Sequence, residues 1–286
     1  MPEEVFDVED ILCVVGTDPA DYGPSRLVVG PRSDGLVRIE NAYVKAAHRA
    51  FIYKSHSGSY GEVNSEEGYQ NLQRFLFGRW AVALSFSGLP QPTPADGTTW
   101  QADMRLAIRG LPVVVSEQQA EHWCPIILTR ELAAEADSAD SPVPIVSTLL
   151  LETEPPGPDR PTGDDVGLSR YVVTLRVYKV VQTHGGFDFR NHLEQVSDWA
   201  DSLIVDVGPA PGGTLGAWSG WNADILASND AVPRMPNELA FAPDAASSTL
   251  VGTVQLPAAA RALPFFGPDA SLQFTVSDRA TATARQ

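Results

Sequence analysis

The chain has 286 residues, of which 43% are apolar, and its formal net charge is −16 at pH 7. A chain of this length can bury a substantial core and typically forms about two domains. The acidic balance leaves no basic surface for phosphates, so no nucleic-acid partner is expected. No apolar run approaches the ~18 residues that a membrane-spanning helix needs, so no transmembrane segment is expected.

Two apolar runs near the N-terminus each precede a loop with a titratable side chain. The run 11–16 is expected to form a strand, and Asp34 lies in the loop region that follows it. The run 50–53 is expected to form a second strand, which His56 follows closely. Continuous apolar runs are typical of parallel strands that are covered on both faces. Because neighbouring parallel strands end at the same edge of a sheet, we expect Asp34 and His56 to lie close together.

A helix is expected over residues 65–77. Asn64 is predicted as its N-cap, with Glu67 three residues later in a capping-box-like pattern, and Gly78 is predicted to end it. One face of this helix is predicted to pack against the sheet, and it consists of Leu72, Phe75 and Leu76. The helix would thereby fix the loop that carries His56.

The order strand, acid, strand, histidine and helix resembles the C-terminal part of lipase- or esterase-like α/β-hydrolases. The resemblance covers residues 5–78. It is carried by Cys13-Val14-Val15-Gly16-Thr17-Asp18, Ser33-Asp34-Gly35-Leu36-Val37, Ser55-His56-Ser57-Gly58 and Glu66-Glu67-Gly68-Tyr69-Gln70-Asn71-Leu72. It implies that Asp34 is the acid and His56 the base of a catalytic triad.

The nucleophile of such a triad is absent from the sequence. In this family a serine in a G-x-S-x-G elbow precedes the acid and the histidine. The chain contains no such pentapeptide, and Gly216-Ala217-Trp218-Ser219-Gly220 departs from it by one position. We therefore expect an N-terminal hydrolase segment, in the same polypeptide or in another chain, to supply the serine.

From residue 79 onward, many short apolar stretches are separated by turn residues. This spacing predicts an antiparallel β-sandwich. The clearest strand is 171–181, in which Val173, Leu175 and Val177 alternate with polar side chains. The expected fold class is thus an α/β-hydrolase fragment over 1–78 followed by an all-β, sandwich-like domain over 79–278. Residues 279–286 are expected to form a disordered tail.

No cofactor and no metal are expected. His122 and Cys124 flank Trp123, but no second pair at zinc-like spacing accompanies them, and there is no glycine-rich phosphate loop. Cys13 lies in a predicted core strand, which favours a free thiol over a disulfide. The acidic N-terminus has no signal-peptide pattern, so a cytoplasmic location is favoured if Met1 is the true start.

Two functional hypotheses follow from different classes of protein. The first is ester hydrolysis of the serine-hydrolase type, with this chain supplying the acid and the base. Lipid or carboxylic esters are the substrates that the resemblance implies. The alternative is a non-catalytic binding or interaction protein built on the β-sandwich.

Overall fold

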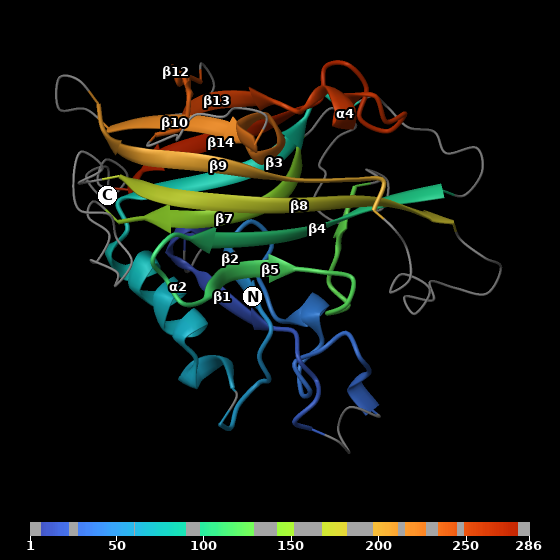
Figure 1. Ribbon diagram of the computed structural model, residues 1–286. Coiled ribbons are helices and arrows are strands. Elements are labelled where there is room, and N and C mark those ends of the chain that lie inside the picture. Colours follow the sequence, from blue (N-terminus) through green and yellow to red (C-terminus); the bar gives the residue numbers. More distant parts are fainter. Residues whose placement is uncertain are drawn as a thin grey trace.

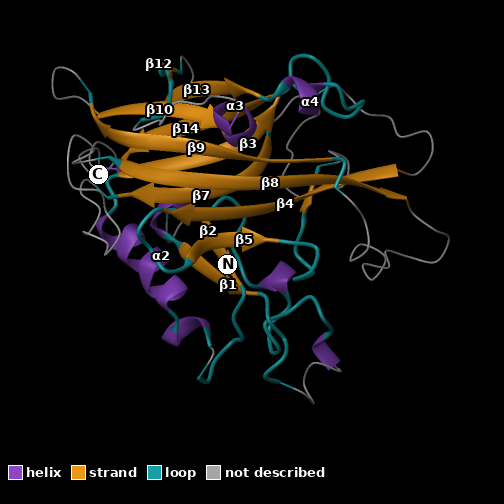
Figure 2. Ribbon diagram, viewed as in Figure 1, coloured by secondary structure: helices purple, strands orange, loops and turns teal. Residues whose placement is uncertain are grey.

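The computed structural model describes residues 7–22, 28–59, 61–89, 98–128, 142–151, 168–181, 197–210, 215–226, 234–244 and 249–279. Two antiparallel sheets are stacked, and a short parallel pair with one longer helix lies below them (Figure 1). Strands predominate over helices throughout (Figure 2). Among these residues, no helix combines the length and the apolar character that crossing a membrane requires.

The larger antiparallel sheet has seven strands. Its order is β11-β10-β9-β8-β4-β5, and β6 pairs with β4 beside that path. The strands are β4 Thr98–Ile108, β5 Val114–Gln118, β6 Ile126–Ile127, β8 Ser169–Val181, β9 Trp199–Pro209, β10 Leu215–Trp221 and β11 Asn237–Glu238. The central strand β4 pairs with β8 along its whole length, from Thr98 opposite Val181 to Ile108 opposite Tyr171, which fixes the register of the sheet.

The smaller antiparallel sheet has the order β12-β13-β14-β3-β7. Its strands are β3 Trp80–Ser87, β7 Val143–Leu150, β12 Ala242–Pro243, β13 Leu250–Gln255 and β14 Ser271–Asp278. Two short helices, α3 Asn222–Leu226 and α4 Ala258–Arg261, lie between strands. The last strand of the chain, β14, pairs with β3, which is the first strand of the two antiparallel sheets in chain order, so the beginning and the end of the sandwich are held together.

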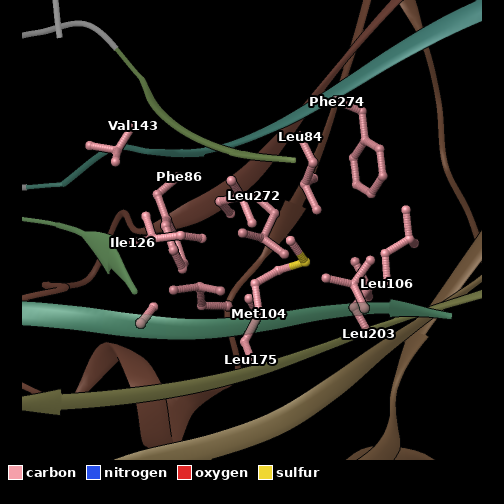
Figure 3. Packing of buried hydrophobic residues seen from close by; sticks show 14 of the residues in the cluster. Leu84, Phe86, Met104, Leu106, Ile126, Val143, Leu175, Leu203, Leu272 and Phe274 are labelled. Atoms are coloured by element: carbon pink, nitrogen blue, oxygen red, sulfur yellow. The ribbon is translucent and has the colours of Figure 1, made fainter. Parts of the chain in front are cut away.

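The core lies between the two antiparallel sheets, whose buried side chains meet in one cluster (Figure 3). Alternation along β4 places Ala102, Met104 and Leu106 on the buried face. Leu175 and Leu203 join them from the same sheet. The side chains that the smaller sheet contributes to this core include Leu84, Phe86, Leu272 and Phe274. Two antiparallel sheets with a shared apolar interior form a sandwich.

The N-terminal region contributes a two-stranded parallel sheet, β1 Leu12–Gly16 with β2 His48–Ile52. Its helical elements are η1 Val8–Asp10, η2 Ile39–Asn41, η3 Glu62–Asn64 and α2 Glu66–Phe77. β1 contains no charged residue, whereas β2 begins with the half-buried His48 and Arg49 and continues with the buried run Ala50-Phe51-Ile52. The N-terminal region packs on the sandwich where α2 and β2 contact the strands β5 and β7.

The expected α/β-hydrolase fragment is wrong as a fold class. Among the strands of the described residues, only β1 and β2 pair in parallel, and both larger sheets are antiparallel. The chain is therefore all-β. The physical reason is the number of strands of each kind. The two apolar runs near the N-terminus form only one parallel pair, whereas the runs after residue 79 form all the other strands, which are antiparallel.

The predicted helix is present over nearly the expected residues, but its details differ. Its N-cap is Ser65, whose Oγ accepts a hydrogen bond of 2.9 Å from the backbone N–H of Gly68. The predicted packing face is wrong for Leu72 and Leu76, which are exposed, and polar side chains of α2 are buried in their place. Phe75 is half-buried, and its ring lies 6.2 Å from that of His48 on β2, between ring centroids.

Candidate functional site

The site lies where the two parallel strands end. β1 and β2 run in register from Leu12 opposite His48 to Gly16 opposite Ile52. The pairing continues one residue further, because the backbone N–H of Thr17 donates to the Ile52 carbonyl at 3.0 Å. Both following loops consequently begin at the same edge of the sheet. Asp34 lies on the first of these loops, and His56 lies on the second.

The carboxylate of Asp34 is fixed by its own loop. Its Oδ1 accepts hydrogen bonds from the backbone N–H groups of Leu36 at 2.9 Å and Val37 at 2.7 Å. The backbone N–H of Asp34 in turn donates to the Val37 carbonyl at 3.2 Å. Asp34 is only 3% exposed. This turn, which an aspartate can make with its own backbone, leaves Oδ2 available for another partner.

That partner is His56. The Nδ1 atom of His56 lies 2.8 Å from Asp34 Oδ2. The two residues are also joined through the backbone, since the His56 N–H donates to the Asp34 carbonyl at 3.0 Å. The His56 side chain is 39% exposed. No described residue makes a hydrogen bond to its Nε2, so one ring nitrogen is anchored and the other is available.

Small polar side chains fasten the histidine loop. The Ser55 hydroxyl donates to Asp21 Oδ2 at 2.7 Å, and the hydroxyls of Tyr22 and Ser57 form a hydrogen bond. The backbone N–H of Glu62 donates to the Ser55 carbonyl at 2.8 Å. The acid loop and the histidine loop are thus tied to one another as well as to the strands.

Gly35 has a backbone conformation and a neighbour that both require glycine. Its φ is +100°, and an added Cβ would lie 2.5 Å from Cδ2 of Tyr22. We expect Gly35→Ala to lower the free energy of unfolding by about 1–3 kcal/mol, the range for a strained backbone position. Urea unfolding monitored by circular dichroism measures this loss.

Gly58→Ala is the matched control for Gly35→Ala. Gly58 also has a positive φ, +91°, but nothing lies within 4 Å of an added Cβ. Gly58→Ala therefore introduces the backbone strain without the clash, and it should lower the free energy of unfolding by less than Gly35→Ala does. An equal or smaller loss in Gly35→Ala would show that the contact with Tyr22 does not hold the acid loop.

Glu62 is a third titratable group at the site, and sequence reasoning missed it. Its Oε1 lies 4.0 Å from His56 Nδ1. Burial raises the pKa of the Glu62 carboxyl and the charge of Asp34 raises it further, while His56 and the Gly16 backbone N–H lower it in part. No motif signalled this residue, because only the fold of the histidine loop brings it here.

The raised pKa of Glu62 predicts a pH-dependent stability. The folded chain holds this proton more tightly than the unfolded chain, where the ordinary pKa of 4.5 applies. Ionisation of Glu62 therefore lowers stability as the pH rises above that value. We expect Glu62→Gln to raise the free energy of unfolding at pH 7 by roughly 0.5–1 kcal/mol, at the small end for single substitutions.

Urea unfolding at pH 7 and pH 4 checks this prediction. The gain should shrink at the lower pH, because most unfolded chains then carry the Glu62 proton as well, given the ordinary pKa of 4.5. Glu238→Gln, at an exposed position on β11, is the control and should change stability little at either pH. A loss of stability in Glu62→Gln at pH 7 would contradict the prediction.

The sandwich supports the site through contacts with β2, α2 and the segment after β2. The backbone N–H of Phe51 on β2 donates to the Ser116 hydroxyl on β5 at 3.1 Å. The Asn71 side chain on α2 donates to the Val115 carbonyl at 2.7 Å. Tyr53, just after β2, stacks on His122 with 3.8 Å between ring centroids. A small apolar cluster joins the two regions and contains Val15, Ile39, Phe51 and Cys124.

Asp34, His56 and Glu62 are also the one set among the described residues with the arrangement of potential metal ligands. Their ligand atoms all lie within 4.8 Å of one another. The short contact between Asp34 and His56 is already accounted for by a hydrogen bond. Cys13 and Cys124 are free cysteines, as expected, and Cys124 is buried.

A nucleophile is missing from this arrangement. Ser55 and Ser57 flank the histidine, but their hydroxyls bind Asp21 and Tyr22. Ser219, in the near-match to the elbow motif, is buried on β10 in the sandwich. Among the residues that the structure describes, none presents a hydroxyl to His56 Nε2.

Comparisons with known protein families, with curated proteins and with solved structures found no match for this chain.

Proposed function

We propose that Asp34 and His56 are the acid and the base of a serine-hydrolase site that cleaves esters. The observation that carries this proposal is the contact of 2.8 Å between Asp34 Oδ2 and His56 Nδ1. The fixed carboxylate and the available Nε2 support it further. The nucleophilic serine comes from another segment, in cis or in trans.

Each group has a defined task in this chemistry. His56 Nε2 accepts the proton of the serine hydroxyl as the serine oxygen attacks the ester carbonyl, and it then protonates the departing alcohol. In the second half, His56 takes a proton from the water that attacks the acyl group, and it gives this proton to the serine oxygen as the bond to the acyl carbon breaks and the acid is released. Asp34 holds the Nδ1 proton and stabilises the imidazolium cation that forms in between.

The burial of Asp34 favours this role. A carboxylate that is 3% exposed and accepts two backbone hydrogen bonds cannot rotate away from the histidine. An ion pair in such a site is stronger than one in water. Lipid or carboxylic esters are the proposed substrates, and this choice rests on the sequence resemblance alone.

Labelling with a fluorophosphonate tests the proposal. The full product of the gene, purified from its native host, is compared with its His56→Ala variant. We expect labelling of one serine that disappears in the variant, because only an activated serine reacts with such probes. Labelling that persists without His56 would contradict the proposal. So would an absence of labelling in the unaltered protein, which the alternative of a non-catalytic binding protein predicts.

A further inference from the structure

Glu62 is a buried titratable group at the site to which the proposed mechanism gives no task. Its Oε1 lies 4.0 Å from His56 Nδ1, the same nitrogen that lies 2.8 Å from Asp34 Oδ2. The side chain of Glu62 is 16% exposed, and that of Asp34 is 4% exposed. Two carboxylates therefore face one ring nitrogen, and both are largely removed from water.

The backbone holds Glu62 in place from two sides. Its N–H donates to the carbonyl of Ser55, the residue before His56, at 2.8 Å. Its carbonyl accepts a hydrogen bond of 2.8 Å from the hydroxyl of Ser65, the N-cap of α2. Glu62 is thus fixed between the histidine loop and the helix, so the fold sets the distance from its carboxylate to the ring.

The end of β1 allows the two carboxylates to approach each other. An added Cβ at Gly16 would lie 2.9 Å from Glu62 Oε2 and 3.0 Å from Asp34 Cβ. The Gly16 N–H is also the backbone donor to the Glu62 carboxylate. Both acids consequently pack against the backbone of one residue, and a residue without a side chain is needed for that approach.

The charges around Glu62 are unfavourable while His56 is neutral. Among the described residues, His56 is the one basic side chain within 4.0 Å of the Glu62 carboxylate. Lys54, two residues before His56, is paired with Glu67 at 3.3 Å. Burial and then the charge of Asp34 raise the pKa of the Glu62 carboxyl. Glu62 therefore faces a like charge, and its potential counter-ion is uncharged.

Protonation of His56 reverses this balance. The imidazolium is a cation whose Nδ1 lies 4.0 Å from Glu62, so the carboxylate gains the partner that it lacks beside the neutral ring. The same attraction is the reason that His56 lowers the pKa of the Glu62 carboxyl in part. An interaction that strengthens as the base takes its proton stabilises the transition state more than the ground state, which is the condition for catalysis.

The expected effect of Glu62 on stability supports a role outside folding. Loss of its charge in Glu62→Gln is expected to stabilise the chain at pH 7, so the carboxylate does not serve the fold there. Buried groups that are perturbed both by desolvation and by a specific charged neighbour are typical of functional sites, where local rules of stability are commonly broken.

We infer, on the basis of the proposed function, that Glu62 is a positioning residue, a second carboxylate that stabilises the imidazolium form of His56 together with Asp34. Asp34 binds Nδ1 directly and so determines which ring nitrogen carries the proton. Glu62 acts through its charge and does not touch the substrate. No bond to Glu62 forms or breaks, because the proton still moves between the serine oxygen and His56 Nε2.

Nitrogen-15 NMR of the His56 ring in the chain itself tests the role of Glu62 without a nucleophile. The quantity compared is the pH at which half of the rings carry both protons. Glutamine at position 62 keeps an oxygen that can accept from the Gly16 N–H, so the charge is what changes. An opposite charge at this distance shifts a titration by roughly 1–3 pH units. Because the ring is 39% exposed, we expect Glu62→Gln to move the midpoint about one unit lower.

Glu117→Gln is the matched control. The side chain of Glu117 is 15% exposed, close to the 16% of Glu62, and it pairs with Arg105 at 3.5 Å in the larger antiparallel sheet. This variant should leave the His56 midpoint unchanged. An unmoved midpoint in Glu62→Gln would overturn the inference, because a purely structural Glu62 predicts that result. Equal shifts in the two variants would also overturn it, since they would report the net charge of the chain.

Fluorophosphonate labelling of the full gene product gives a second readout. In Glu62→Gln, the plateau rate at high pH should fall roughly three- to tenfold, because a ring whose charged form is less stable is a weaker base. The pH of half-maximal labelling should fall together with the NMR midpoint. A lower rate with an unmoved half-maximal pH would mean that Glu62 acts on the structure of the site alone, which would overturn the inference.

The two measurements also separate the role of Glu62 from the proposed function. Labelling that depends on His56, combined with an unmoved ring midpoint in Glu62→Gln, would overturn the role of Glu62 and leave the proposed function standing. An absence of labelling in the unaltered protein would overturn the proposed function, and with it the assignment of Glu62 to a hydrolase site, whatever the ring midpoint.

Discussion

Asp34→Asn is expected to lower the rate of ester hydrolysis by the proposed site roughly 10⁴-fold, the loss seen when a triad acid becomes its amide. The amide oxygen of the new side chain can still accept the hydrogen bonds from Leu36 and Val37, so the loop is retained. The amide nitrogen, however, would donate to His56 Nδ1. The histidine proton then moves to Nε2, which can no longer accept a proton from serine.

Hydrolysis of a chromogenic ester by the full gene product measures this loss. Asp18→Asn is the control, because Asp18 Oδ1 also accepts a backbone hydrogen bond, from Ala20 at 2.8 Å, and no bond joins it to His56. Circular dichroism and thermal unfolding should show both variants folded. A rate in Asp34→Asn that stays within a few-fold of Asp18→Asn would exclude Asp34 as the triad acid.

Phe266→Ala is expected to cost about 3–5 kcal/mol in the free energy of unfolding, as large-to-small changes of buried aromatic residues do. Phe266 is 0% exposed. Its ring lies 5.4 Å from Phe86, 5.3 Å from Phe265 and 6.0 Å from Trp199, between ring centroids. Alanine would leave a cavity at the junction of both antiparallel sheets, which the surrounding strands cannot close.

Urea unfolding of the chain measures this cost, and Phe77→Ala provides the same chemical change on the surface. Phe77 is 71% exposed at the end of α2, so its replacement should change stability by less than about 0.5 kcal/mol. Comparable losses in the two variants would mean that Phe266 does not lie in the sandwich core.

The positions of Asp34 and His56 could be predicted because both depend on local pattern. Each follows an apolar run, and parallel pairing of the two runs is enough to bring their loops together. The antiparallel character of the later strands was also predictable, since alternation such as that of Val173, Leu175 and Val177 reports burial on one face. The fold class was not, because it depends on how many strands join each sheet.

Two further features of the site depend on tertiary contacts and could not be predicted. Glu62 reaches the site only through the path of the histidine loop. The apolar face of α2 reads from sequence as its buried face, but Asn71 and Arg74 are buried instead because their polar groups find partners. Periodicity identifies an apolar face and does not say what covers it.

The measurement that tests the central claim most directly is nitrogen-15 NMR of the His56 ring in the chain itself. We expect neutral His56 to carry its proton on Nδ1, hydrogen-bonded to Asp34, and to have an unprotonated Nε2 that can act as a base. In Asp34→Asn the proton should move to Nε2. A neutral His56 with its proton on Nε2 in the unaltered chain would contradict the assignment of His56 as the base, because that nitrogen could not then take a proton from serine.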